Sequence, residues 1–147
     1  MNINVKIKLV REGGTLPEYA TDGSAAVDLR NADEDVTIAP GEWKLIPTGI
    51  AIAPETSGVV AILAARSGLS IKHGITTTNG IGVIDSDYRG EISVSLTNIS
   101  NKPYTVAHGE RMAQLMFMPV LRANFIPVVT LDKTERGAGG FGSTGKN

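Results

Sequence analysis

The segment from Gly80 to Glu91 contains residue types that could activate water. Its apolar pair, Val83-Ile84, is followed at once by Asp85, where a strand should end in a partly enclosed position. A carboxylate there could accept a proton from water as a general base, and Tyr88 could form a wall beside it. A plain turn, in which Asp and Gly serve only backbone geometry, explains the same residues.

A second cluster could bind an anion. Arg66 and Ser67 directly follow the apolar run from Val59 to Ala65. An Arg, a hydroxyl and adjacent backbone N–H groups at a strand-to-helix junction suit a phosphate. The alternative is that Ser67 is only the N-cap of a short helix.

Two polar residues interrupt apolar stretches elsewhere. Asp28 lies inside an apolar strand, where an unpaired charge is costly, so Arg66 is its expected partner. Gln114 lies between Met112 and Met116, where its amide could contact a ligand or simply satisfy backbone groups.

The segment from Gly137 to Asn147 is rich in glycine and has one large apolar residue, Phe141. It matches two glycine-rich phosphate patterns, but neither lies in the strand–loop–helix unit that such loops need. By composition alone the segment is a frayed, mobile end, because it cannot bury enough surface to offset its ordering entropy.

The elements that must position these residues are mainly strands. Apolar residues alternate from Ile3 to Leu9 and from Ile92 to Leu96, and glycine and proline interrupt the chain often. The segment 80–91 is predicted to be a hairpin, and one short helix should run from Arg66-Ser67 to Gly74. Further expected strands are Val59 to Ala65, buried on both faces; Trp43 to Ile52, bent or at an edge; Met112 to Met118; and Phe125 to Leu131. Many short strands predict a β-sandwich, jelly roll or barrel.

Composition narrows the possible functions. The 147 residues suit one domain, and a net charge of −1 disfavours a surface for nucleic acid or anionic lipid. The absence of Cys excludes disulfides and thiolate chemistry, and two His are too few for a His-rich metal site. No apolar run is long enough to span a membrane and no signal peptide is recognisable, so we expect a cytoplasmic protein.

Taken in order, these segments resemble the five motifs of the trimeric dUTP diphosphatases (dUTPases). The third and fifth motifs together are highly specific, and the five cover nearly the whole chain. The matching segments are Gly23 to Arg30, Arg66 to Leu69, Asn79 to Val94, Gly109 to Leu115 and Arg136 to Gly145.

The resemblance implies an all-β fold, a distorted jelly roll or β-clip barrel over residues 1–131, followed by a flexible C-terminal arm over residues 132–147. It implies a homotrimer with active sites at the subunit interfaces, and Mg²⁺ on the triphosphate. The activity would be hydrolysis of dUTP to dUMP and pyrophosphate, which limits uracil incorporation into DNA and supplies dUMP for thymidylate synthesis. The alternatives are a dCTP deaminase-like enzyme of the same fold and a dUTPase-like regulatory binding protein.

The resemblance also assigns roles around the nucleoside. Asp85 would deprotonate the attacking water and contact the 3′-hydroxyl, and Tyr88 would pack under the deoxyribose and exclude a 2′-hydroxyl. The uracil edge would be read by a further set of residues: Asn79, Gly82, Val83, Ile84 and Ser93.

The remaining roles concern the phosphates. Asp28 would act behind them, on Arg66 or on a magnesium-bound water, as an outer-shell group only. The direct phosphate ligands would be Arg66, Ser67, Gly68 and Gln114. The arm would close over the nucleotide, with Phe141 stacked on uracil and the β- and γ-phosphates covered by Arg136, Gly142, Ser143 and Thr144.

Overall fold

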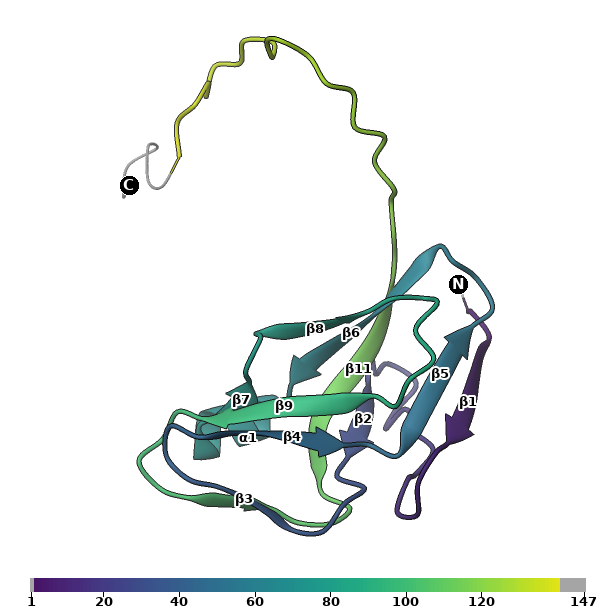
Figure 1. Ribbon diagram of the computed structural model, residues 1–147, viewed down its shortest axis with the longest axis vertical. Coiled ribbons are helices and arrows are strands. Elements are labelled where there is room, and N and C mark those ends of the chain that lie inside the picture. Colours follow the sequence, from purple (N-terminus) through teal and green to yellow (C-terminus); the bar gives the residue numbers. More distant parts are fainter. Residues whose placement is uncertain (1, 141–147) are drawn as a thin grey trace.

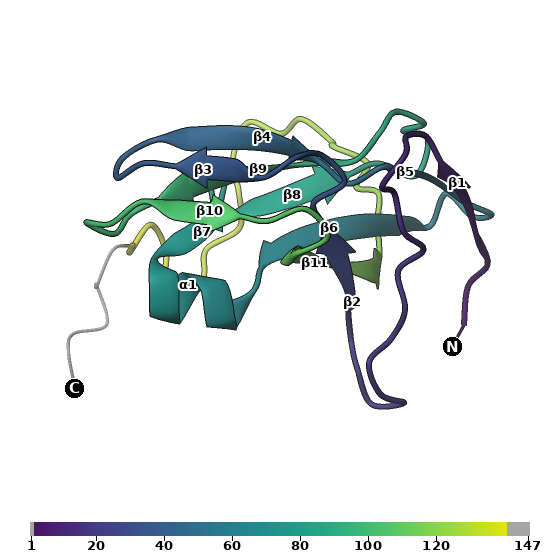
Figure 2. The same ribbon diagram turned by 90° about the horizontal axis from the view of Figure 1, so that it is seen from below.

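The computed structural model describes residues 2–140 (Figures 1 and 2). Within these residues the chain forms strands and one short helix in the order β1 (Val5–Leu9), β2 (Val27–Arg30), β3 (Val36–Ile38), β4 (Trp43–Pro47), β5 (Ile50–Pro54), β6 (Val59–Ala65), α1 (Ser67–His73), β7 (Ile75–Thr77), β8 (Ile81–Ile84), β9 (Ser93–Asn98), β10 (Tyr104–Val106) and β11 (Arg111–Pro119).

The strands form four small sheets around one core. The larger sheets have the orders β2-β11-β6-β8 and β4-β9-β7, and two pairs, β1-β5 and β3-β10, complete the body. The alternation predicted for Ile92 to Leu96 is confirmed, since Val94 and Leu96 are fully buried while Ser93 and Ser95 are half-buried. The predicted all-β fold of the jelly-roll and β-clip type is likewise confirmed.

Strand β6 lies at the centre of the four-stranded sheet. Its residues pair with β11 on one side and with β8 on the other. Ala61 and Leu63 are buried in the core, but the residues that alternate with them are only half-buried. The prediction of burial on both faces is therefore met on one face of the single protomer.

The strand expected from Trp43 to Ile52 bends, as its Pro47 and Gly49 predict. It divides at Thr48-Gly49 into β4, which pairs with β9, and β5, which pairs with β1. Gly49 has φ +73°, and a Cβ there would stand 2.9 Å from the backbone nitrogen of Gly14. A side chain is thus excluded at this corner by both conformation and space.

Helix α1 confirms the short helix, and Gly74 ends it in the left-handed conformation with φ 67°. The N-cap position is occupied by Arg66, without a side-chain cap, so the interpretation of Ser67 as N-cap is wrong. Within the described chain, no helix has the length and apolar character needed to cross a membrane.

Two strand predictions are wrong. The segment 80–91 is not a hairpin, because β8 pairs with β6 while β9 pairs with β4 and β7. Phe125 to Leu131 forms no strand; after Pro119 the described chain runs away from the body as an extension (Figure 1). Phe125 is 90% exposed, since an alternating apolar pattern makes a strand only where a partner edge lies beside it.

Candidate active site

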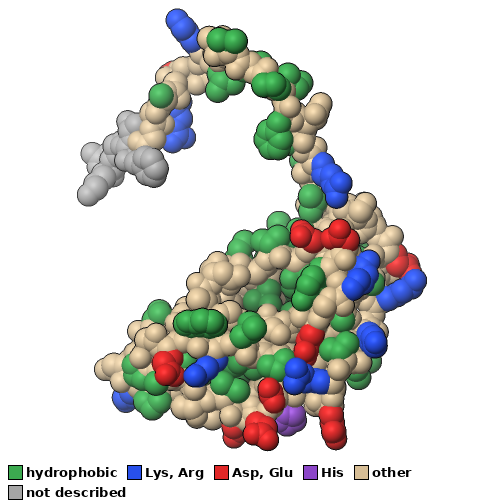
Figure 3. All heavy atoms as spheres, in the orientation of Figure 1, with side chains coloured by type: hydrophobic (Ala, Val, Ile, Leu, Met, Phe, Trp, Pro, Cys, Tyr) green, Lys and Arg blue, Asp and Glu red, His purple; other side chains and the backbone are tan. Residues whose placement is uncertain are grey.

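A pocket opens where β8 and β9 diverge into different sheets. It has a volume of about 320 Å³, within the range of small-molecule sites. Figure 3 shows this face hollowed between the two strands, with hydrophobic side chains in the hollow. Its lining residues are Leu45, Leu63, Asn79, Gly82, Val83, Ile84, Asp85, Tyr88, Glu91, Ile92, Ser93 and Ser95.

The backbone of two strands is open towards this pocket. Strand β8 is the last strand of its sheet, so it presents unpaired N–H and C=O groups along one edge. Ser93, at the start of β9, pairs with Pro47 of β4, whereas the pairing of β9 with β7 begins only at Leu96. A planar ligand with donors and acceptors on its edge can therefore bind between the two strands.

The turn after β8 carries Asp85 and Tyr88 to the rim of the pocket. The backbone N–H of Tyr88 donates to the carbonyl of Asp85 at 3.1 Å. The two residues therefore also form a turn, which was the alternative to a catalytic role. The hydroxyl of Tyr88 donates to the carbonyl of Glu91 at 3.1 Å. A Cβ on Gly90 would stand 2.6 Å from Cζ of Tyr88, so the bare glycine makes room for the ring.

Asp85 is exposed in the protomer rather than partly enclosed as predicted. The reason is that the chain leaves the sheet at Ile84 and the turn projects beyond the paired strands. The Asp85 side chain is therefore accessible to water.

The second group of predicted residues gathers around Asp28. Arg66 Nε lies 2.8 Å from Asp28 Oδ1, which confirms the expected ion pair, and Arg111 Nη1 lies 3.2 Å from Oδ2. Arg66 Nη1 also donates to the carbonyl of Arg111 at 2.9 Å. The guanidinium of Arg66 is thus fixed on one side, which leaves Nη2 for a ligand.

Gln114 joins this group through the sheet. It lies opposite Asp28 on β2 and opposite Ala64 on β6, and its Nε2 donates to the carbonyl of Ala65 at 2.9 Å. Gln114 therefore satisfies a backbone group, as one of the two interpretations predicted, and its amide oxygen remains available. Ser67 and Gly68 follow immediately at the exposed start of α1.

Asp85 and the Asp28 group lie at opposite ends of β6, although the pocket extends along the strand as far as Leu63 and Gly82. Ile84, next to Asp85, pairs with Ala61, whereas Arg66 follows the other end of the strand. Five residues of extended strand separate these points by about 16 Å. Figures 1 and 2 show the same separation, with α1 at one end of β6 and the β8–β9 connection at the other. One protomer does not bring Asp85 and Arg66 together.

The predicted arm residues lie elsewhere. Arg136 Nε donates to the carbonyl of Gly139 at 2.9 Å, within its own turn of the extension. Four predicted residues, Phe141, Gly142, Ser143 and Thr144, lie outside the described residues.

Sequence reasoning missed several residues at both sites. Glu91 and Ser95 line the pocket, and Arg111 shares the carboxylate of Asp28. Glu91 belongs to the segment already singled out, so its position could have been noticed. Arg111 belongs to the segment Gly109 to Leu115, also singled out, but its contact with Asp28 joins residues 83 positions apart and no local pattern shows it.

A family model described as dUTPase matches residues 12–145. The deoxyuridine 5′-triphosphate nucleotidohydrolase of Desulfitobacterium hafniense (strain DSM 10664 / DCB-2) is 50% identical over 147 residues, covering 98% of this chain and 97% of that protein. The same-named protein of Tolumonas auensis is 51% identical, covering 99% and 98%. The solved Staphylococcus bacteriophage 80alpha dUTPase with dUpNHpp is 26% identical with a TM-score of 0.88, covering 97% and 98%. This chain therefore belongs to the dUTPase family.

Proposed function

We propose that the pocket between β8 and β9 binds the deoxyuridine part of dUTP and that Asp85 activates the water that hydrolyses it. As a member of the dUTPase family the chain is a dUTP hydrolase, and this membership disfavours the deaminase and purely regulatory alternatives. The observation that carries the proposal is a carboxylate at the rim of a pocket whose walls are two open strand edges and the ring of Tyr88.

Recognition of the base depends mainly on backbone. Uracil presents a planar edge of donors and acceptors, which the open edges of β8 and β9 near Val83, Ile84 and Ser93 can match. Asn79 adds a side-chain amide, and Gly82 leaves the pocket wall without a side chain. We expect the pocket wall to leave no space for a 5-methyl group, so that thymine is excluded. The ring of Tyr88 packs under the deoxyribose and leaves no space for a 2′-hydroxyl.

The reaction requires one proton transfer and one displacement. Asp85 accepts a proton from water, the water oxygen bonds to the α-phosphorus, and the bond to the bridging oxygen breaks so that pyrophosphate leaves with its electron pair. The products are dUMP and pyrophosphate, with no covalent intermediate. Hydrolysis of dUTP limits uracil incorporation into DNA and supplies dUMP for thymidylate synthesis.

The phosphates contact the group around Asp28. Arg66 approaches through Nη2, held in orientation by Asp28, and Gln114 donates the second N–H of its amide nitrogen, since only one is used on Ala65. Ser67 and the backbone at Gly68 complete the cradle, and a Cβ at Gly68 would meet no atom within 4 Å, so the backbone there is open to a ligand. Charge-assisted contacts of this kind stabilise the negative charge that develops on the phosphates.

The described residues fit Mg²⁺ that arrives with the triphosphate. No cluster of three His, Asp or Glu among residues 2–140 could hold a metal by itself, and Mg²⁺ commonly binds through substrate phosphates while keeping several waters. Asp28 uses one oxygen for each Arg partner, and a carboxylate has about four lone-pair sites, so it can accept a further bond from a metal-bound water. The bound ion would neutralise phosphate charge.

The separation of the two groups along β6 supports a homotrimer with shared sites. A water on Asp85 must reach the α-phosphorus, and that phosphate must contact the Arg66 group, so the two groups have to come from different protomers. Ile81 and Val83 of β8 are 53% and 62% exposed in one protomer, which suits a face covered by a neighbour.

The C-terminal arm, residues 132–147, closes over the bound nucleotide in this scheme. Phe141 would stack on uracil, while Arg136, Gly142, Ser143 and Thr144 would cover the β- and γ-phosphates. Deleting residues 136–147 should remove most of the hydrolysis and leave the melting temperature of the trimer nearly unchanged. Equal rates for the truncated and full chains would show that the segment is only a frayed end.

The direct test is hydrolysis of dUTP, UTP, dTTP and dCTP with Mg²⁺, with pyrophosphate measured through a coupled pyrophosphatase. We expect dUTP to be hydrolysed and the other three to react far more slowly, since UTP adds a 2′-hydroxyl, dTTP adds a 5-methyl group and dCTP has a different base edge. Comparable rates for dUTP and dCTP would contradict the proposed reading of the uracil edge.

A further inference from the structure

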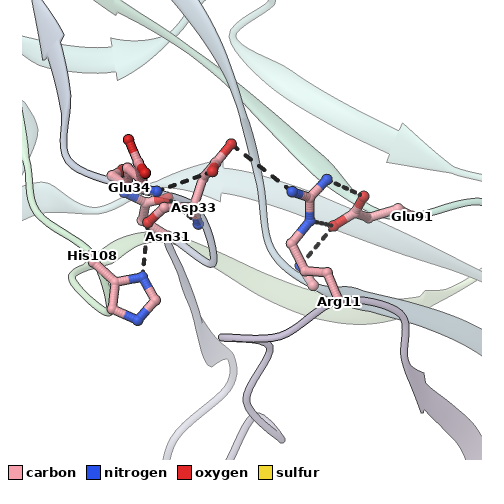
Figure 4. A network of polar contacts seen from close by, with 7 residues as sticks. Arg11, Asn31, Asp33, Glu34, Glu91 and His108 are labelled. Atoms are coloured by element: carbon pink, nitrogen blue, oxygen red, sulfur yellow. Dashed lines mark hydrogen bonds and ion pairs between the residues drawn. The ribbon is translucent and has the colours of Figure 1, made fainter.

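Glu91 is tied to the N-terminal segment by a bidentate ion pair (Figure 4). Arg11 Nε donates to Glu91 Oε1 at 2.8 Å and Arg11 Nη2 donates to Oε2 at 3.0 Å. The backbone N–H of Gly49 donates to the same Oε1 at 2.9 Å. The Glu91 side chain is only 24% exposed, so this is a specific contact rather than a loose surface pair.

The same residue supports the pocket wall. Its carbonyl accepts the hydroxyl of Tyr88, and its position among the lining residues places it on the pocket surface. The following residue, Ile92, bonds to the β4–β5 corner through Ile50 O at 2.9 Å and Thr48 N at 3.1 Å. The chain from Tyr88 to Ile92 is therefore fixed at one end by backbone bonds and at Glu91 by Arg11.

Arg11 is itself held in place. The preceding residue, Val10, donates its N–H to the carbonyl of Gly49 at 2.8 Å, and the third guanidinium nitrogen of Arg11 lies 3.9 Å from Asp33 Oδ2 (Figure 4). The guanidinium thus joins the N-terminal segment to Asp33 and, through Glu91, to the chain from Tyr88 to Ile92.

We propose that Arg11 and Glu91 are positioning residues that hold the Tyr88 ring in place and thereby set the preference for deoxyribose over ribose. The proposal rests on the binding mode given above, in which Tyr88 lies under the sugar. Neither residue touches the reacting atoms. When Arg11 is removed, Glu91 keeps only Gly49 as its partner, its backbone gains freedom, and the carbonyl that anchors the Tyr88 hydroxyl moves. A ring that can retreat leaves space for a 2′-hydroxyl.

The test is the ratio of kcat/KM for dUTP to kcat/KM for UTP in Arg11→Met, Glu91→Gln and the double variant. We expect each single change to lower the ratio about five- to tenfold, the size of effect that one hydrogen bond to an anchor can have. The double variant should match the single variants rather than multiply their effects, because both break one unit. Tyr88→Phe, which keeps the ring and removes the anchored hydroxyl, should lower the ratio similarly.

Glu55→Gln is the matched control. Lys6 Nζ lies 3.5 Å from Glu55 Oε1, so this ion pair also ties the N-terminal region to a distant part of the chain, but neither residue lines the pocket. The control should keep the parent ratio. The proposal is overturned if folded Arg11→Met or Glu91→Gln retains the parent dUTP/UTP ratio, or if Glu55→Gln lowers it equally. If Arg11→Met does not fold, Arg11→Lys, which keeps the charge and loses the bidentate geometry, answers the same question. A parent that fails to hydrolyse dUTP at all would instead contradict the proposed function.

Discussion

The two predicted halves of the active site are built in opposite ways. Around Asp28, side chains of Arg66 and Arg111 already meet the carboxylate, and Gln114 already bonds to Ala65. In the β8–β9 pocket, the binding groups are open backbone edges, and Asp85 and Tyr88 lie exposed at the rim.

This difference indicates what each half needs from a neighbour. The Asp28 group is ordered within one protomer, so it can present a fixed guanidinium to phosphate without further support. The pocket lacks a cover over Asp85, and Ile81 and Val83 of the adjoining strand β8 are exposed. A site assembled from one protomer's ordered phosphate group and another's open pocket would use both halves.

The largest expected effect is from Asp85→Asn, which keeps the shape of the pocket and removes the proposed general base. Loss of a general base typically costs about 10²–10⁴-fold in rate, so kcat should fall by that range while the affinity for a non-hydrolysable dUTP analogue changes little. Single-turnover hydrolysis and equilibrium binding measure the two quantities. A variant with kcat within about twofold of the parent would mean that another group is the base.

If the protein is the proposed trimer, mixed trimers test whether Asp85 and Arg66 of one site come from different protomers. Asp85→Asn and Arg66→Met should each be nearly inactive alone. After the two are unfolded and refolded together in equal amounts, about one quarter of the sites of a random trimer receive both intact groups, so about a quarter of the parent activity should return. A mixture that stays as inactive as its components would place both groups in one protomer, since every protomer then carries one defect.

The features that the sequence predicted correctly depend on the chemistry and backbone preferences of a few residues. The cost of an unpaired charge in a strand predicted that Asp28 would contact Arg66, and the structure confirms it at 2.8 Å. Gly74 predicted the end of α1, and it adopts the left-handed conformation there. Pro47 with Gly49 predicted the bend between β4 and β5. Each of these depends on a few neighbouring residues.

The errors come from choices that depend on distant parts of the chain. Residues 81–84 and 93–98 have the patterns of paired strands, but β6 and β7 provide competing edges, so β8 and β9 separate and the pocket forms between them. The ion pair of Arg11 with Glu91 joins residues 80 positions apart, and no local pattern shows it. The pocket therefore exists because the predicted hairpin does not form.

Gly68→Ala should change stability and activity in opposite directions at the proposed phosphate-binding group around Asp28. A Cβ would meet no atom within 4 Å, and alanine favours the helix, so the melting temperature should rise slightly. The same Cβ would stand where the backbone approaches phosphate, and we expect kcat/KM for dUTP to fall about tenfold or more. Gly58→Ala, in the turn before β6, is the control and should leave activity unchanged. If Gly68→Ala keeps the parent kcat/KM, the phosphates do not approach this backbone.

The smallest expected effect is a different pH dependence of stability in the two regions. The hydrogen bonds from Arg11 lower the pKa of Glu91 beneath its usual value near 4.5. A carboxylate whose pKa is lowered in the folded state stabilises the fold fully above its unfolded-state pKa, and this stabilisation is lost as the pH falls through the folded-state pKa. The stabilisation from the ion pair of Arg11 with Glu91 should therefore weaken below about pH 4.5. Near Arg66, burial and the hydrogen bond to Glu110 raise the pKa of Tyr104 to about 12.

For Tyr104 the sign is reversed. Its raised pKa favours the neutral phenol in the folded state, so its contribution is complete below about pH 10 and is lost as pH rises towards 12. The free energy of unfolding in urea, measured at fixed protein concentration across the acid and the alkaline range, tests both expectations. Glu91→Gln should flatten only the acid loss, and Tyr104→Phe only the alkaline loss. If Glu91→Gln leaves the loss of stability at acid pH unchanged, the ion pair with Arg11 does not stabilise the folded state. The segment from Tyr88 to Ile92 is then held by the backbone bonds of Ile92 alone.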